Sequence, residues 1–139
     1  MVGVAQSLRE HSGESEKITI NLGYVDLGRI DLLVQEGFYA NRSDFIRTAI
    51  RNQFGAQADM IERSVARHTL DMGLCVYDAA TLEAARAAGE SLHIKVLGLA
   101  RIAPDVSPEL AKAAIASITV LGAFQASAAV KAALADRIR

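Results

Sequence analysis

The chain of 139 residues is long enough for one ordinary domain, or for one very small domain followed by a larger one. Hydrophobic residues make up 51% and charged residues 22% of the sequence, which excludes global disorder. The formal net charge of −1, from 15 basic and 16 acidic residues, excludes strong attraction to a polyanion by total charge alone.

The cysteine content and the hydropathy pattern bear on the cellular compartment. Cys75 is the single cysteine, which excludes an intramolecular disulfide framework and favours a reducing compartment. Residues 1–16 contain no long apolar segment typical of a signal peptide, and no apolar run approaches the ~20 residues of a membrane span. We therefore expect a cytoplasmic protein without membrane contact.

The N-terminal segments are expected to be an arm followed by a strand. Residues 1–15 carry serines and a glycine among charged neighbours and show no periodicity, which is typical of a flexible arm. From Lys17 to Leu22 polar and apolar residues alternate strictly, which predicts a half-buried strand. One face of this strand carries Ile18, Ile20 and Leu22, and the opposite face carries Lys17, Thr19 and Asn21.

Two short helices are predicted next. The first has an apolar stripe at spacings of three and four, and Gly37 is placed to end it in a left-handed conformation; the stripe consists of Leu27, Ile30, Leu33 and Val34. The second begins with a pattern resembling a capping box, Asn41 followed by Asp44, and is expected to end at Gly55. Its expected buried face consists of Phe45, Ile46, Ala49 and Ile50.

A strand and two helices of this length cannot bury enough apolar surface to be stable alone. Cysteine or metal staples are missing from this segment, so a partner is the remaining solution. Two copies pairing their strands into an antiparallel ribbon covered by four helices would bury both apolar sets. The expected dimer core is Ile18, Ile20, Leu22, Ile30, Phe45, Ile46 and Ile50.

Residues 16–55 resemble the ribbon-helix-helix regulators, particularly their CopG-type branch. The resemblance rests on Lys-Ile-Thr-Ile-Asn-Leu at 17–22 and on the stretch from Gly37 to Arg51, which contains Asn-Arg-Ser-Asp at 41–44. It implies that the paired strands enter the major groove of double-stranded DNA and that the second helix grips a phosphate. The base-reading residues implied are Lys17, Thr19 and Asn21, and the phosphate-binding residues implied are Asn41, Arg42 and Ser43.

An internal repeat organises the C-terminal half. Similar segments begin at Thr69, Ile94 and Ile118, and their glycines, Gly73, Gly98 and Gly122, lie 25 and 24 residues apart. Each segment precedes a loop and an Ala-rich helical stretch, at residues 81–88, 107–115 and 128–138. We therefore predict an α+β protein in which residues 56–68 form a connecting helix or linker. Residues 69–139 are expected to form strand-loop-helix repeats with short parallel strands, serving oligomerisation or an effector.

Catalysis and metal sensing find little support. Ser43 is accounted for by the helix start, and the sequence offers no glycine-rich phosphate motif, so we expect no enzyme and no cofactor. His68 and His93 stand five residues before their glycines, where stacked repeats would place them ~4.8 Å apart. With Cys75 they are the weak candidates for a metal site, and three ligands are too few to define one.

The sequence therefore predicts a nucleoid-associated transcriptional regulator of prokaryotic type, a repressor that binds operator DNA as a dimer or a higher oligomer. Alternatives are a DNA-organising or segregation protein, an antitoxin and a metal-responsive regulator. An antitoxin tail is usually polar and disordered when free, whereas residues 69–139 are apolar and periodic. An effector or protein partner of the C-terminal half stays open.

Overall fold

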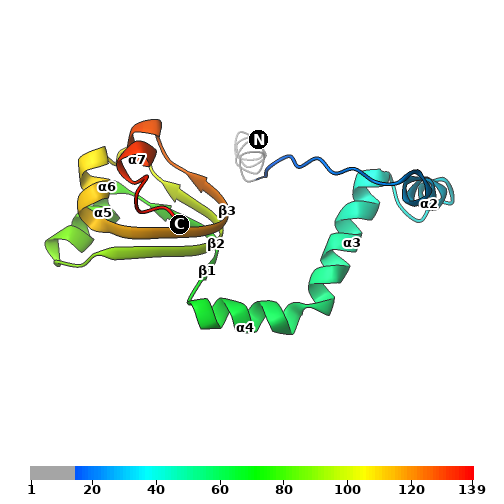
Figure 1. Cartoon of the computed structure of the whole chain (residues 1–139), viewed down its shortest axis with the longest axis horizontal. Coiled ribbons are helices and arrows are strands. Elements are labelled where there is room, and N and C mark those ends of the chain that lie inside the picture. Colours follow the sequence, from blue (N-terminus) through cyan, green and yellow to red (C-terminus); the bar gives the residue numbers. More distant parts are fainter. Residues whose placement is uncertain (1–14) are drawn as a thin grey trace, which may run out of the picture. The chain divides into compact units, whose positions relative to one another are not determined.

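The computed structural model describes residues 15–139, so nearly all of the arm expected at residues 1–15 lies outside the described residues. The chain divides into two compact units, residues 1–61 and 62–139, each of which is described by itself (Figure 1). Within residues 15–139 no helix combines the length and the apolar character needed to cross a membrane.

Helix α2 spans Tyr24–Gln35 and ends as predicted at Gly37. Gly37 has a φ of +85°, and its N–H donates to the carbonyl of Val34, while the N–H of Phe38 donates to the carbonyl of Leu33. This pair of hydrogen bonds is a Schellman motif, which requires a left-handed residue at the position of the glycine. The turn ends α2 and leads into the next helix.

Helix α3 spans Arg42–Ala56 and starts at the predicted cap, Asn41. Its end differs from the prediction, because Gly55 is the penultimate residue of α3 and does not terminate it. Gln57, with a φ of −112°, separates α3 from helix α4, which spans Ala58–His68. Gly55 has no positive φ, so its flexibility is not used to stop the helix. The connecting segment expected at 56–68 is therefore mostly helical.

The segment predicted as a strand, residues 17–22, forms no paired strand in the single chain, where residues 15–23 have no regular secondary structure. A strand is defined by hydrogen bonds to a neighbour, and the only sheet within residues 15–139 lies in the C-terminal unit. Ile18, Ile20 and Leu22 are 75%, 57% and 40% exposed. We therefore still predict that this segment forms a strand with one buried face, but only when two chains pair.

The C-terminal unit contains a three-stranded parallel sheet in the order β1-β2-β3. The strands span Asp71–Tyr77, Leu92–Ile102 and Ile115–Gln125. Each is followed by a helix, namely α5 (Ala79–Ala87), α6 (Pro108–Ala114) and α7 (Ala128–Ala133). The predicted parallel repeat is confirmed, because Gly73, Gly98 and Gly122 occupy one register across the sheet.

Each repeated glycine lies inside a strand and has a positive φ, +115° at Gly73, +137° at Gly98 and +123° at Gly122. Such φ values strain any residue that has a Cβ atom, so glycine is required at this point of every strand. Figure 1 shows β2 and β3 bending partway along, with α5, α6 and α7 stacked beside the sheet. Strand, bend and helix together make one coil of a short solenoid.

The core of the C-terminal unit lies between the strands and the helices. Leu82 of α5, Leu110 of α6 and Val130 of α7 pack with strand residues such as Ile94 and Ile118. The N-caps fix where two of the helices begin: the hydroxyl oxygen of Ser107 accepts from the N–H of Leu110, and that of Ser127 accepts from Val130. Asp78 caps α5 in the same way, through the N–H of Thr81 at 2.8 Å.

The C-terminal tail returns to the outer edge of β3 and pairs with it at one point. Ile118 donates its N–H to the carbonyl of Arg137 at 2.9 Å, and Arg139 donates to the carbonyl of Ile118 at 2.8 Å. The Arg137 guanidinium donates to the carbonyl of Ile115 at 2.7 Å and also to that of Lys112. These bonds hold the tail against the end of the unit.

Candidate nucleic-acid interface

The three residues predicted to read bases, Lys17, Thr19 and Asn21, are all exposed. They alternate along the chain with Ile18, Ile20 and Leu22, so an extended segment directs the two sets to opposite faces. Lys, Thr and Asn side chains can all hydrogen-bond to base edges. The segment therefore keeps its polar set available while its apolar set has no adequate cover in one chain.

An apolar groove of about 510 Å³ opens in the N-terminal unit. It is lined by six of the seven residues predicted as dimer core, all except Ile18, namely Ile20, Leu22, Ile30, Phe45, Ile46 and Ile50. Ile30 is 5% exposed and is the only fully buried residue among 15–61, whereas Ile50 is 42% exposed. Ala49, predicted on the buried face of the second helix, also lines the groove. Three lining residues were not predicted from the sequence, namely Asp26, Arg29 and Gln53.

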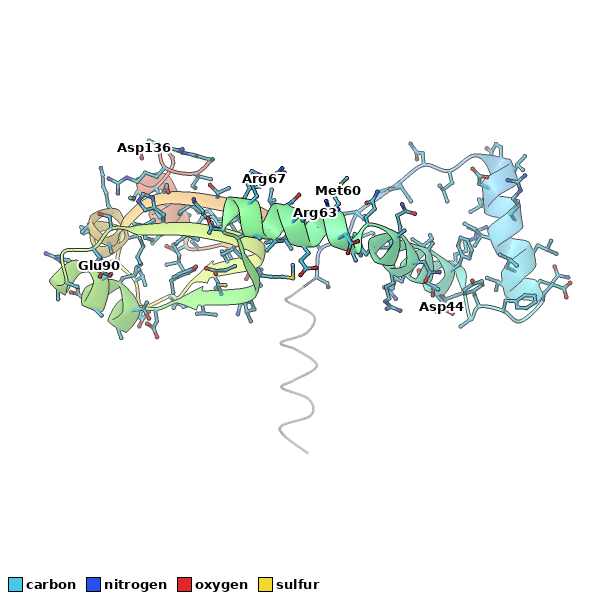
Figure 2. All side chains as sticks on the ribbon, turned by 90° about the horizontal axis from the view of Figure 1, so that it is seen from below. Asp44, Met60, Arg63, Arg67, Glu90 and Asp136 are labelled. Carbon is cyan, nitrogen blue, oxygen red and sulfur yellow. The ribbon has the colours of Figure 1, made fainter. Side chains whose placement is uncertain are left out.

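The start of α3 is held by reciprocal hydrogen bonds. The side-chain oxygen of Asn41 accepts from the N–H of Asp44 at 2.8 Å, and the Asp44 carboxylate accepts from the N–H of Ala40 at 2.9 Å. Figure 2 labels Asp44 at this turn. The predicted capping-box-like start is confirmed, with the acid bonding one residue earlier than the cap itself. Arg42 and Ser43 occupy the first turn of α3, where backbone N–H groups have no partner within the helix and suit an anion.

Arg42 forms an ion pair that the sequence did not indicate. Its Nε and Nη2 donate to the two carboxylate oxygens of Asp31 at 2.7 and 2.8 Å, which joins α2 to the start of α3. The hydrogen bond and the positive charge of Arg42 lower the pKa of Asp31, and the same pair raises the pKa of Arg42. A phosphate bound here would meet a guanidinium that already shares its charge with Asp31.

The weak candidates for a metal site are not placed as equivalent residues. His68 is the last residue of α4, whereas His93 lies in β2 and its Nδ1 bonds to the Ser117 hydroxyl at 2.8 Å. The expectation that the two histidines occupy the same place in successive repeats is therefore wrong, because a turn separates the end of α4 at His68 from the start of β1 at Asp71. Cys75 is partly buried against the core of the C-terminal unit. Residues 15–139 contain no cluster of three possible metal ligands.

Comparison with known families gives a match over most of the chain. Residues 13–131 match the model of the Ribbon-Helix-Helix transcriptional regulator family, and the chain belongs to this family. The match extends well beyond residues 16–55 and ends within α7, so it covers all three strands and most of the strand-helix repeats. No curated protein and no solved structure matches the chain.

Proposed function

We propose that the protein binds double-stranded operator DNA as a homodimer and represses transcription there. Residues 17–22 of two chains pair as an antiparallel ribbon and enter the major groove. The observation that carries this proposal is the apolar groove of the N-terminal unit, lined by six residues expected in the dimer core. Family membership supports a DNA-binding regulator.

The groove favours a second chain over a small ligand. Among residues 15–61 many large apolar side chains are more than half exposed, namely Ile18, Ile20, Tyr24, Val25, Leu32, Phe38, Phe54 and Met60. So many exposed large apolar side chains in fewer than 50 residues favour a surface that another protein chain covers. A second copy brings its own Ile18, Ile20 and Leu22 to the groove, and pairing the two segments satisfies backbone groups that a ligand would leave open.

The polar face of the ribbon then supplies the base contacts. Two copies of Lys17, Thr19 and Asn21 lie side by side on the face away from the groove, within reach of base edges. The first turn of α3, with Arg42, Ser43 and the cap Asn41, is proposed to hold a backbone phosphate. Residues 14–55 carry six acidic and five basic residues, so their net charge does not attract DNA. The affinity for DNA therefore has to come from the placement of these contacts.

The test is selection of preferred DNA from a random pool, carried out with the full chain and with single variants. Lys17→Ala, Thr19→Ala and Asn21→Ala should each lose ~1 to 3 kcal/mol of discrimination at particular base positions. Ser43→Ala should weaken binding to every sequence alike, because phosphate contacts do not read sequence. Lys95→Ala removes an exposed lysine from β2 and is the matched control. Unchanged base preference in all three ribbon variants would show that the groove assignment is wrong.

An organising or segregation role is the second candidate. Within residues 15–139 the outer edge of β1 is unpaired and that of β3 is paired only at Ile118, and such edges favour assembly. The selection experiment separates the two functions. A repressor shows sharp base preference, whereas an organising protein coats DNA cooperatively with little preference.

A further inference from the structure

The solenoid of the C-terminal unit ends in two open strand edges. Within residues 15–139, β1 pairs with β2 alone, and the outer edge of β3 is paired only at Ile118, by the tail. Natural proteins usually cover or charge such edges, because an open edge offers a row of hydrogen-bonding groups to another chain. The residues that alternate along β1 toward the outside are instead apolar: Met72, Leu74 and Val76 are 61%, 49% and 49% exposed.

The repeated glycines give the two edges opposite and complementary shapes. A Cβ atom added at Gly98 would lie 2.3 Å from the carbonyl oxygen of Gly73, and one added at Gly122 would lie 2.1 Å from the carbonyl oxygen of Gly98. Each glycine therefore directs its carbonyl toward the following strand and presents its bare Cα to the preceding one. By the same geometry Gly122 directs its carbonyl to the outer edge of β3. Gly73 presents its Cα outward, with nothing within 4 Å of an added Cβ.

Apolar side chains in the same register on the three strands form rows across the sheet, called ladders below. The outer members of these ladders lack a neighbour on one side. Met72, Leu97 and Leu121 stand in one register. The outer members, Met72 and Leu121, are 61% and 57% exposed, whereas Leu97 between them is partly covered. In the neighbouring ladder Leu74 is 49% exposed and the central Leu99 only 9%. Neighbouring strands thus cover the central residues, and another strand at either end would cover the outer ones.

Among residues 15–139, none pairs with the outer edge of β3 beyond Ile118, in the part of β3 that a second β1 needs. Asp71 is level with Val96, and Val96 is level with Val120, so a β1 strand continuing the register on β3 begins at Val120. The tail pairs at Ile118, which lies before this point. The first coil has no strand before Asp71, because α4 and its turn occupy those positions. The two edges can therefore meet without displacing the tail.

We propose that β1 of one molecule adds in parallel to β3 of a second copy, with Gly73 placed over the carbonyl of Gly122, so that the solenoids continue head to tail. The contact is heterologous, since it joins unlike surfaces, and it links N-terminally paired dimers into larger assemblies. It requires no DNA and does not depend on which bases the ribbon reads.

Cross-linking between two differently tagged variants tests this pairing in the full chain. Both carry Cys75→Ala, one adds Met72→Cys and the other adds Leu121→Cys. Residues in register on adjacent strands lie ~4.8 Å apart, within the Cα range of a disulfide. Mild oxidation should link the two tags to each other. Leu97→Cys is the matched control, because this ladder position is on the central strand and should not link molecules.

Oxidation of each cysteine variant by itself tests for symmetric contacts between two copies. Met72→Cys linking to itself would show a symmetric contact between two β1 edges and overturn the proposal, as would Leu121→Cys linking to itself. Light scattering provides the second measurement: the full chain should exceed dimer mass as concentration rises, and Met72→Lys or Leu121→Lys should return it to the dimer. A wild-type mass that stays dimeric at high micromolar concentration would also overturn the inference. The proposed function would stand in that case, provided that the dimer still selects DNA.

Discussion

The Asp31–Arg42 ion pair bears directly on how α3 would meet a phosphate in the proposed complex with DNA. Both carboxylate oxygens of Asp31 are engaged by Arg42, and both side chains remain about half exposed. Arg42 was predicted from the sequence as a phosphate contact, but its competitor is eleven positions away on another helix. A local pattern such as Asn41 followed by Asp44 is visible in the sequence, whereas a pair between two helices depends on their packing.

Asp31→Asn should strengthen DNA binding in a sequence-independent manner. The substitution removes a negative charge beside the first turn of α3 and frees the guanidinium of Arg42, so attraction to any phosphate backbone increases. Titration at low salt should show tighter binding to specific and random duplexes alike, and Arg42→Ala should show the reverse. Asp59→Asn is the control for loss of an acid elsewhere. If Asp31→Asn leaves random-duplex affinity unchanged, Arg42 does not contact phosphate.

The same pair predicts a pH dependence of stability. Because Arg42 lowers the pKa of Asp31, the folded protein gains stability from the ionised carboxylate above the ordinary pKa of an aspartate. This gain is lost as the pH falls through the lowered pKa. Thermal midpoints measured from pH 5 downward should therefore fall more steeply for the wild type than for Asp31→Asn. Parallel curves would show that the pair does not form in solution.

At the level of the elements, the glycine spacing was the most informative signal in the C-terminal half. Spacings of 25 and 24 predicted coils in one register, and the sheet has that register. The first coil was predicted less well, because Thr69 and Leu70 belong to the turn that ends α4. The N–H of Leu70 donates to the carbonyl of Val65, and Thr69 has a φ of +52°. Strand entry there is set by the preceding helix, which the repeat pattern does not describe.

Alanine substitutions at the repeated glycines should differ in their effect. All three impose strain, because φ is positive, but Gly98→Ala and Gly122→Ala also place a Cβ within 2.3 Å of a carbonyl oxygen of the neighbouring strand. Gly73→Ala has no such neighbour in its own chain. Urea unfolding of dilute protein should show the two inner variants less stable than Gly73→Ala. Equal losses would mean that strain alone accounts for the glycines.

Tyr77 at the end of β1 should make the C-terminal unit less stable at high pH. Burial, with smaller contributions from Cys75 and Asp71, raises the pKa of Tyr77 to about 12. The unfolded chain ionises its tyrosines near ~10, so stability is unaffected below that pH and is lost as the pH rises from there through about 12. Unfolding of Tyr77→Phe should depend less on pH over this range, and Tyr24→Phe, at an exposed position, is the control.

For the whole molecule, the sequence predicted that the N-terminal unit needs a partner, which stays a prediction. Six of the seven residues expected in the dimer core line one groove, because they combine an alternating pattern with helical spacing. How residues 17–22 of two chains would pair cannot be read from the fold of a single chain. The free edges of the solenoid likewise depend on which strands are outermost, which the repeat alone does not determine.

Unfolding of the N-terminal unit should depend on protein concentration. Only one residue among 15–61 is buried, so a single copy lacks a core and we expect its folding to be coupled to association. A tryptophan reporter, Phe54→Trp, on the exposed side of α3 should show a midpoint that rises with concentration. Ile20→Asp should lower that midpoint and abolish DNA binding, whereas Thr19→Asp should impair only DNA binding. A midpoint independent of concentration would argue for a folded monomer.

The shared register of the glycines means that the solenoid can be lengthened by one whole coil without altering either end. The 24 positions from Gly98 to Gly122 are one such unit, so duplicating residues 93–116 would insert one further strand and a second α6 in the same register. In a stack of coils each interface adds its own stabilisation, so the four-coil chain should resist urea better than the natural one. The C-terminal unit is thus a repeat structure in which the number of coils, three in this chain, can change without a change of fold.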